Sequence, residues 1–154
     1  MKRWLLLLLA LALSLATYPA ALMERNGLAA AGGDFGEINS VIKGAVEDDS
    51  WLYLKTEDEV KALLSKYYDG ELLVKLTRDA WNFNRKSTDW YSRAKLVSVD
   101  VKEINPQSAT AEAVLEVEDV ISGARQRGKA VYTMNRGKEG WRVNNVCYKW
   151  TVEV

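Results

Sequence analysis

The sequence contains no histidine, and this absence excludes more chemistry than any other feature of the composition. Without imidazole the chain lacks Ser-His-Asp and Cys-His catalytic sets, imidazole zinc sites and the commonest general acid–base group. The single cysteine, Cys147, excludes an intramolecular disulfide and a zinc site built from cysteine pairs. The sequence also lacks a Gly-rich phosphate loop, a nucleophile elbow and an internal repeat. We therefore predict no catalytic residue, no metal site and no cofactor.

An excess of charge of either sign is also missing, because 21 basic residues balance 21 acidic residues. A chain so close to neutral lacks the electrostatic footprint of a nucleic-acid-binding protein. We therefore expect no nucleic-acid partner.

The first 23 residues form an apolar segment behind a basic amino terminus. The stretch from Trp4 to Met23 carries no charged residue. This pattern is typical of a secretory signal peptide, and small residues offer cleavage points after Ala16 and Ala31. The alternative is an uncleaved anchor, because 20 residues at about 1.5 Å each can span a bilayer of about 30 Å. Either outcome predicts an extracytoplasmic protein, secreted or membrane-anchored, and contact with the membrane is expected only through this segment if it stays uncleaved.

The chain after this segment divides into a linker and one domain. Small residues between Leu28 and Gly33 are typical of a linker, which we place at residues 24–33. Residues 34–154 then form a domain of roughly 120 residues, a size that suits a single hydrophobic core.

The first half of this domain has the apolar periodicity of helices. A first helix begins near Asp34, which is placed to cap it with Glu37 three residues later. Thr56 and Glu59 form a capping box at the start of a second helix. Residues 71–81 have the pattern of a third helix, and Asp69 precedes it as a cap.

The second half changes to the alternation that is typical of β-strands. Four strands are predicted, over residues 97–101, 109–117, 130–134 and 141–152. The alternation changes parity across Asn144 and Asn145, which predicts a β-bulge in the last strand. Bulges bend sheets, so we expect a curved antiparallel meander whose concave side is available to helices or a ligand.

The order of helices and strands resembles the NTF2-like, cystatin-like superfamily. The resemblance is carried by the final stretch Gly140-Trp141-Arg142-Val143-Asn144-Asn145-Val146 and by the alternating Ala109–Val114, and it covers about residues 56–152. It implies an α+β fold in which N-terminal helices pack on a curved antiparallel sheet of about four strands. The superfamily includes isomerases, cyclases, dehydratases, transport adaptors, dimerisation domains and secreted inhibitors. None of its catalytic positions can be carried over, and the His–Asp pair of the dehydratase-like members cannot exist here.

Two groups of residues are candidates for binding. Trp81, Trp90 and Tyr91 flank a polar loop, where they would form an exposed patch or the rim of a pocket, although aromatic residues also serve as core packing. Arg125 and Arg127 are predicted at a hairpin tip, where they would meet an anionic polymer or the acidic cleft of a protein. Charges at a hairpin tip also serve solubility.

Other side chains have simpler interpretations. A buried Asp facing the concave side could act as a base, but Asp100 is predicted on the solvated face of its strand. Cys147 is predicted to be a half-buried packing residue.

Together these features predict an exported, non-catalytic binding domain. We expect it to act as an inhibitor or adaptor on an envelope protein, or to pair with a second copy of itself as a homodimer. The alternative is a pocket for a small apolar ligand, with or without carboxylate-based isomerase or cyclase activity.

Overall fold

The computed structural model describes residues 31–86 and 92–150. Helices precede strands, in the order α1 (Ala31–Glu47), a 3₁₀ turn (Ser50–Tyr53), α2 (Glu57–Leu64), α3 (Gly70–Asn84), β1 (Ser92–Ile104), β2 (Ser108–Asp119), β3 (Arg125–Gly137) and β4 (Gly140–Trp150). The predicted apolar segment, residues 24–30 of the predicted linker, and the candidates Trp90 and Tyr91 lie outside the described residues. Residues 31–33, which the sequence places in the linker, already belong to α1.

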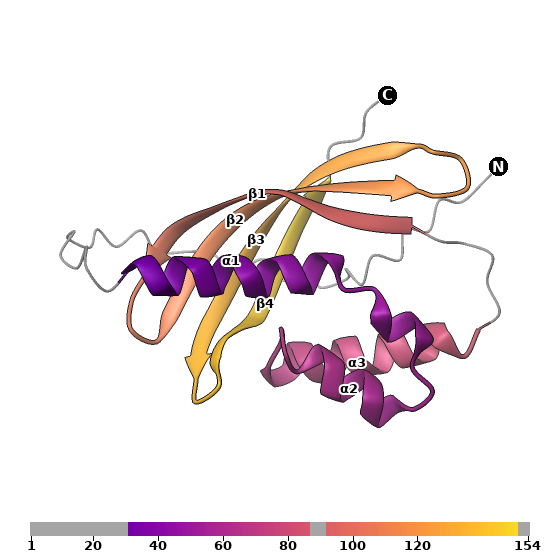
Figure 1. Cartoon of the computed structure of the whole chain (residues 1–154), viewed down its shortest axis with the longest axis horizontal. Helices are drawn as coiled ribbons and strands as arrows, with labels where there is room; N and C mark the ends of the chain where they lie inside the picture. Colours follow the sequence, from indigo (N-terminus) through magenta and orange to yellow (C-terminus); the bar gives the residue numbers. More distant parts are fainter. Residues whose placement is uncertain (1–30, 87–91, 151–154) are drawn as a thin grey trace.

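The four strands form one antiparallel meander in the order β1-β2-β3-β4. The three helices lie on one side of this curved sheet: α1 crosses β1 and β4, and α3 contacts β4 and packs against α2 (Figure 1). We call the sheet face toward the helices the inner face and the opposite one the outer face. The predicted α+β architecture is confirmed. In the described part of the chain, no helix is both long and apolar enough to cross a membrane.

The core lies between the inner face and the helices. Small and aliphatic residues of β2 alternate inward, and those from Ala109 to Leu115 belong to the same buried cluster as Ile38 and Ile42 of α1. Trp141 and Tyr132 are the largest fully buried side chains. The small side chains of Ala109, Ala111 and Ala113 let the helices approach the sheet closely. The prediction of Trp141 as a core residue is confirmed.

The capping box of α2 is confirmed. The Glu59 backbone N–H donates to Thr56 Oγ1 at 3.2 Å, and the Thr56 backbone N–H donates to Glu59 Oε2 at 3.0 Å. Both residues are close in sequence, so local geometry alone decides this contact.

The predicted cap of α1 is wrong, because Asp34 and Glu37 contact β3 and β4 instead. The Asp34 carboxylate pairs with Arg136 at 3.0 Å and accepts a bond from Trp141 Nε1 at 3.4 Å. Glu37 Oε1 accepts a hydrogen bond from the Trp141 backbone N–H at 3.0 Å. These partners lie about a hundred residues away along the chain, so they fix the start of α1 to the turn between β3 and β4.

The predicted bulge of β4 is confirmed. Thr133 pairs with Asn145 and Met134 with Val143, so Asn144 is the extra residue. The edge strand β1 has two further register shifts, one between Leu96 and Ser98. That irregularity leaves Val97 exposed, whereas the sequence pattern placed it in a row with Val99. Bulges bend the sheet around the helices.

Candidate functional site

The turn between β2 and β3 is ordered by one carboxylate. Asp119 Oδ1 accepts hydrogen bonds from the backbone N–H groups of Ile121 and Ser122, both at 2.9 Å. The Asp119 backbone N–H donates to the Ala124 carbonyl at 2.8 Å, and Gly123 takes the positive φ of 70° that the reversal requires. These bonds, that from Ser122 foremost, hold the pKa of Asp119 below its usual value. The turn is therefore held in one conformation by its own polar groups.

This ordered turn presents two aliphatic side chains to solvent. Ile121 is 71% exposed and Val120 is 45% exposed. Burying such a side chain is worth about 1.5–3 kcal/mol, and here most of that free energy is left unused. Large exposed apolar groups at the tip of a stiff element are typical of a contact surface.

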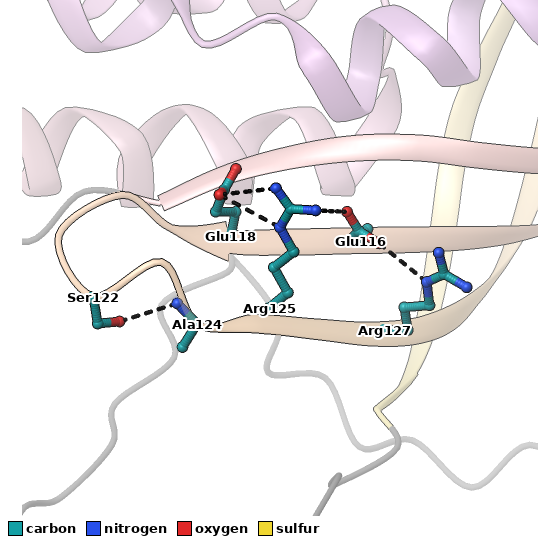
Figure 2. A network of polar contacts seen from close by, with 6 residues as sticks. All are labelled: Glu116, Glu118, Ser122, Ala124, Arg125 and Arg127. Carbon is teal, nitrogen blue, oxygen red and sulfur yellow. Dashed lines mark hydrogen bonds and ion pairs between the residues drawn. The ribbon is translucent and has the colours of Figure 1, made fainter.

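Below the tip, a ladder of charged residues crosses the outer face. Glu118 pairs with Arg125 at 3.2 Å, and Glu116 pairs with Arg127 at 3.1 Å and with Arg125 at 3.8 Å (Figure 2). In the strand register Glu118 is directly opposite Arg125, and Glu116 is directly opposite Arg127. Each exposed pair contributes at most about 1 kcal/mol, so the ladder aligns the two strands rather than dominating stability. We call the turn and this ladder, residues 116–127, the hairpin end.

A shallow groove of about 370 Å³ runs from the hairpin end to the edge of β1. Its lining carries charges of both signs: Glu47, Arg93, Ala94, Lys95, Glu116, Glu118 and Arg125. Glu47, at the end of α1, accepts a hydrogen bond from the Leu96 backbone N–H at 3.0 Å. That bond occupies a donor on the free edge of the sheet, which protects the edge from pairing with another strand.

The structure changes the interpretation of the two predicted arginines. Arg125 and Arg127 lie within β3 and not at the hairpin tip, which residues 120–124 form. Their guanidinium groups are more than 60% exposed but are paired with glutamates. A pattern of basic residues does not show that acidic residues of the next strand lie opposite them, since the register sets that contact. The tip is apolar and not basic.

The predicted aromatic patch is not joined to these arginines. Trp81 lies on α3 and packs, partly buried, against the core on the helix side of the sheet. The arginines project from the outer face, so the sheet separates the two groups. Cys147, predicted as half-buried, is exposed on the outer face of β4 because the bulge shifts its parity. Asp100 is solvated as predicted.

Sequence reasoning missed Val120, Ile121 and the turn-forming role of Asp119. A signal for the turn was available, because Asp followed four residues later by Gly is typical of a reversal closed by an Asx side chain. Because basic residues follow Gly123, the hairpin tip was predicted too far along the chain.

The inner face carries a cluster of tyrosines that packs beside the core. The Tyr132 hydroxyl is buried and lies next to the hydroxyl of Tyr148. Burial, with the neighbouring Tyr148 and Tyr68 hydroxyls adding to it, raises the pKa of Tyr132 well above its usual value. Tyr68 is satisfied, because its hydroxyl donates to the Ala45 carbonyl at 2.8 Å. The cluster therefore places hydroxyl groups inside an otherwise apolar core.

Asp69 is the carboxylate whose surroundings best fit a functional role. It occupies the position before α3, as predicted, but its side chain makes no capping hydrogen bond. Its Oδ1 is buried without a partner, and burial raises the pKa of Asp69 although Arg142 opposes the shift. Across residues 31–86 and 92–150, no three His, Cys, Asp or Glu side chains lie close enough together to hold a metal ion.

Solved structures share this fold at low sequence identity. A protein from Novosphingobium aromaticivorans, provisionally described as an aromatic ring hydroxylase, aligns with a TM-score of 0.57 at 13% identity over 79% of this chain and 91% of that one. An NTF2-like protein with a cystatin-like fold from the same species aligns at 0.54 and 16% identity, over 79% and 84%. A domain of unknown function with a cystatin-like fold from Nostoc punctiforme aligns at 0.53 and 15%, over 80% of each chain.

These likenesses concern the fold alone. The chain therefore has the NTF2-like, cystatin-like fold that its sequence predicts. No family model and no curated protein matches the sequence. Because the fold hosts many unrelated functions, the function has to be argued from the site.

Proposed function

We propose that this chain is an exported, non-catalytic domain that binds an envelope protein as an inhibitor or adaptor, and that the hairpin end makes the contact. The observation that carries the proposal is the exposed aliphatic tip on a stiff hairpin. The Asp119 hydrogen bonds and the Glu–Arg ladder fix the tip before binding. Preorganisation of this kind reduces the entropy lost on association. The apolar amino-terminal segment supports the proposed location.

The proposal is tested by affinity capture from native envelope, with the full chain as bait and mass spectrometry as the readout. Ile121→Asp should reduce capture of the partner about tenfold or more, since a buried aliphatic anchor contributes about 1.5–3 kcal/mol. Val74→Asp is the matched control, because Val74 is 58% exposed on α3, outside the hairpin end. If both variants capture the same proteins as the unaltered chain, the hairpin end is not the contact surface.

A second set of variants separates charge recognition from hairpin stiffness. Arg125→Glu with Arg127→Glu breaks the ladder and repels Glu116 and Glu118. Adding Glu116→Arg and Glu118→Arg restores opposite charges across the strands but reverses their polarity. If the partner binds the arginine side chains themselves, neither variant should capture it. If the partner needs only a stiff hairpin, the fourfold variant should capture it again. Capture that survives the double variant refutes both roles of the ladder.

The second candidate function is a pocket for a small apolar ligand, with or without carboxylate-based isomerase or cyclase chemistry. The buried tyrosine hydroxyls beside the core and the raised pKa of Asp69 favour it. Trp81 and Trp150 pack against the same core, so an apolar ligand that enters there should change tryptophan fluorescence. Tyr132→Phe should weaken a ligand that bonds to the hydroxyl. A fluorescence signal that no apolar ligand changes would exclude this function.

A further inference from the structure

The outer face carries two lysines that oppose each other without an acid between them. Lys129 of β3 and Lys149 of β4 are directly paired in the strand register, and both side chains are exposed on the outer face. Neither ammonium group has a hydrogen-bond or ion-pair partner among the described residues. Like charges at directly opposite positions destabilise a sheet. Among the described residues, no carboxylate offsets the charge of this pair.

The lysine pair belongs to a larger basic half of the outer face. This half holds six cationic residues and only two acids: Arg93, Lys95, Arg125, Arg127, Lys129 and Lys149 against Glu116 and Glu118. The other half carries Asp100, Glu103 and Glu112 with Lys102. The chain as a whole has no net charge, so this excess of four positive charges is a local feature. A broad cationic surface of this kind is complementary in charge to the layer of phosphate groups on a membrane.

We propose that the basic half of the outer face, centred on Lys129 and Lys149, docks on anionic phospholipid headgroups of the membrane that the amino-terminal segment enters. This inference rests on the proposed location beside a membrane, but it does not depend on a protein partner. Each lysine near an anionic surface adds to binding, and two ammonium groups on neighbouring strands can share one phosphate.

The length of the preceding chain permits this contact. The start of α1 is fixed beside Arg136 by the Asp34 ion pair. Lys129 lies seven residues from Arg136 along β3, or about 23 Å at roughly 3.3 Å per residue. Residues 24–30 can extend to roughly 25 Å. The anchor and the basic half can therefore reach one bilayer surface together, with the domain lying on its outer face and the hairpin end beside the membrane.

Cys147 provides a reporter that needs no added cysteine. It is the sole cysteine, it is exposed, and it lies two residues from Lys149 on the same face of β4. The full chain, labelled at Cys147 with a fluorophore, is inserted through its amino-terminal segment into vesicles of phosphatidylcholine, alone or mixed with phosphatidylglycerol. Both vesicles contain headgroup-labelled quencher lipids. Because the segment tethers the domain in each case, a difference in quenching reports docking and not attachment.

We expect strong quenching in the phosphatidylglycerol vesicles only, and its loss near 1 M salt, where the screening length falls to about 3 Å. Lys149→Glu should abolish quenching and also raise the urea midpoint, because it turns a like-charge pair into an opposite-charge pair. A variant that is more stable and does not dock cannot be explained by misfolding. Lys149→Arg should keep docking, and Lys61→Glu on α2 is the charge-matched control.

The other outcomes would overturn the inference. Equal quenching in the two vesicle types, quenching that survives Lys149→Glu, or no quenching in either vesicle each shows that the basic half does not dock on anionic lipid. The affinity capture described above is carried out after solubilisation of the envelope in detergent. A failure of lipid docking and a failure of the protein-binding proposal are therefore separate results.

Discussion

Gly140 gives the sharpest test of how the first helix is fastened to the sheet. It lies in the turn between β3 and β4 with a positive φ of 98°. A Cβ atom built at this position would lie 1.9 Å from Glu37 Oε1, far inside any allowed contact. Gly140→Ala must therefore strain the backbone and displace the Glu37 carboxylate together.

The size of the effect follows from these two contributions. A residue other than glycine at such a φ costs about 1–3 kcal/mol. Displacing Glu37 breaks the 3.0 Å hydrogen bond from the Trp141 backbone N–H, and a bond to a charged group contributes about 1.5–3 kcal/mol. We expect Gly140→Ala to lower the free energy of unfolding by about 2.5–6 kcal/mol. Urea unfolding followed by tryptophan fluorescence measures this loss, because Trp141 is fully buried in the folded state.

A double-mutant cycle isolates the contact. In a Glu37→Ala background the carboxylate is absent, so Gly140→Ala should cost only the backbone strain of about 1–3 kcal/mol. Gly137→Ala is the control, because its nearest neighbour would be 3.9 Å away and its φ is not positive. Strict additivity of Glu37→Ala and Gly140→Ala would refute the proposed contact.

Three further predictions concern pH and packing. The Tyr67 hydroxyl donates to Asp48 at 2.7 Å, and burial together with this bond raises the pKa of Tyr67 to about 12. Because unfolded tyrosine ionises near pH 10, the free energy of unfolding should be unaffected by this group below about pH 10 and fall between about pH 10 and 12, less steeply in Tyr67→Phe. The lowered pKa of Asp119 predicts a dependence at acidic pH: the hairpin turn keeps its carboxylate hydrogen bonds above about pH 4 and loses them as pH falls through the folded pKa. The amide NMR shifts of Ile121 and Ser122 measure this loss. Asp119→Asn should abolish the pH dependence of these shifts. Gly128→Ala should displace Trp150, whose ring would lie 2.4 Å from the added Cβ, and shift tryptophan emission to the red; an unchanged spectrum would contradict the packing of Trp150 over Gly128.

The contacts that sequence reasoning predicted correctly are local or periodic. The capping box of Thr56 and Glu59 joins residues three apart, so no distant element was needed to fix it. The bulge at Asn144 followed from a change of parity within one strand. The burial of Trp141 followed from its place in an alternating apolar row.

The errors concern side chains whose partners come from another element. Asp34 has the spacing of a helix cap, but the fold places Arg136 and Trp141 of the sheet beside it, and both bind its carboxylate. Arg125 and Arg127 read as free basic groups until the register places Glu118 and Glu116 opposite them. In both cases a charged group bonded to the partner that the fold brought near, and not to the nearest group in sequence.

The sequence by itself determined the uncharged apolar stretch near the amino terminus, the change from helical to strand periodicity, and the exclusion of histidine chemistry, because composition and spacing are properties of the chain alone. Only the tertiary structure decided which surface can act. It placed Val120 and Ile121 at the tip, neutralised the two arginines, and set Lys129 opposite Lys149. The physical reason is that exposure and charge pairing depend on strand register, and register joins residues that the sequence keeps far apart.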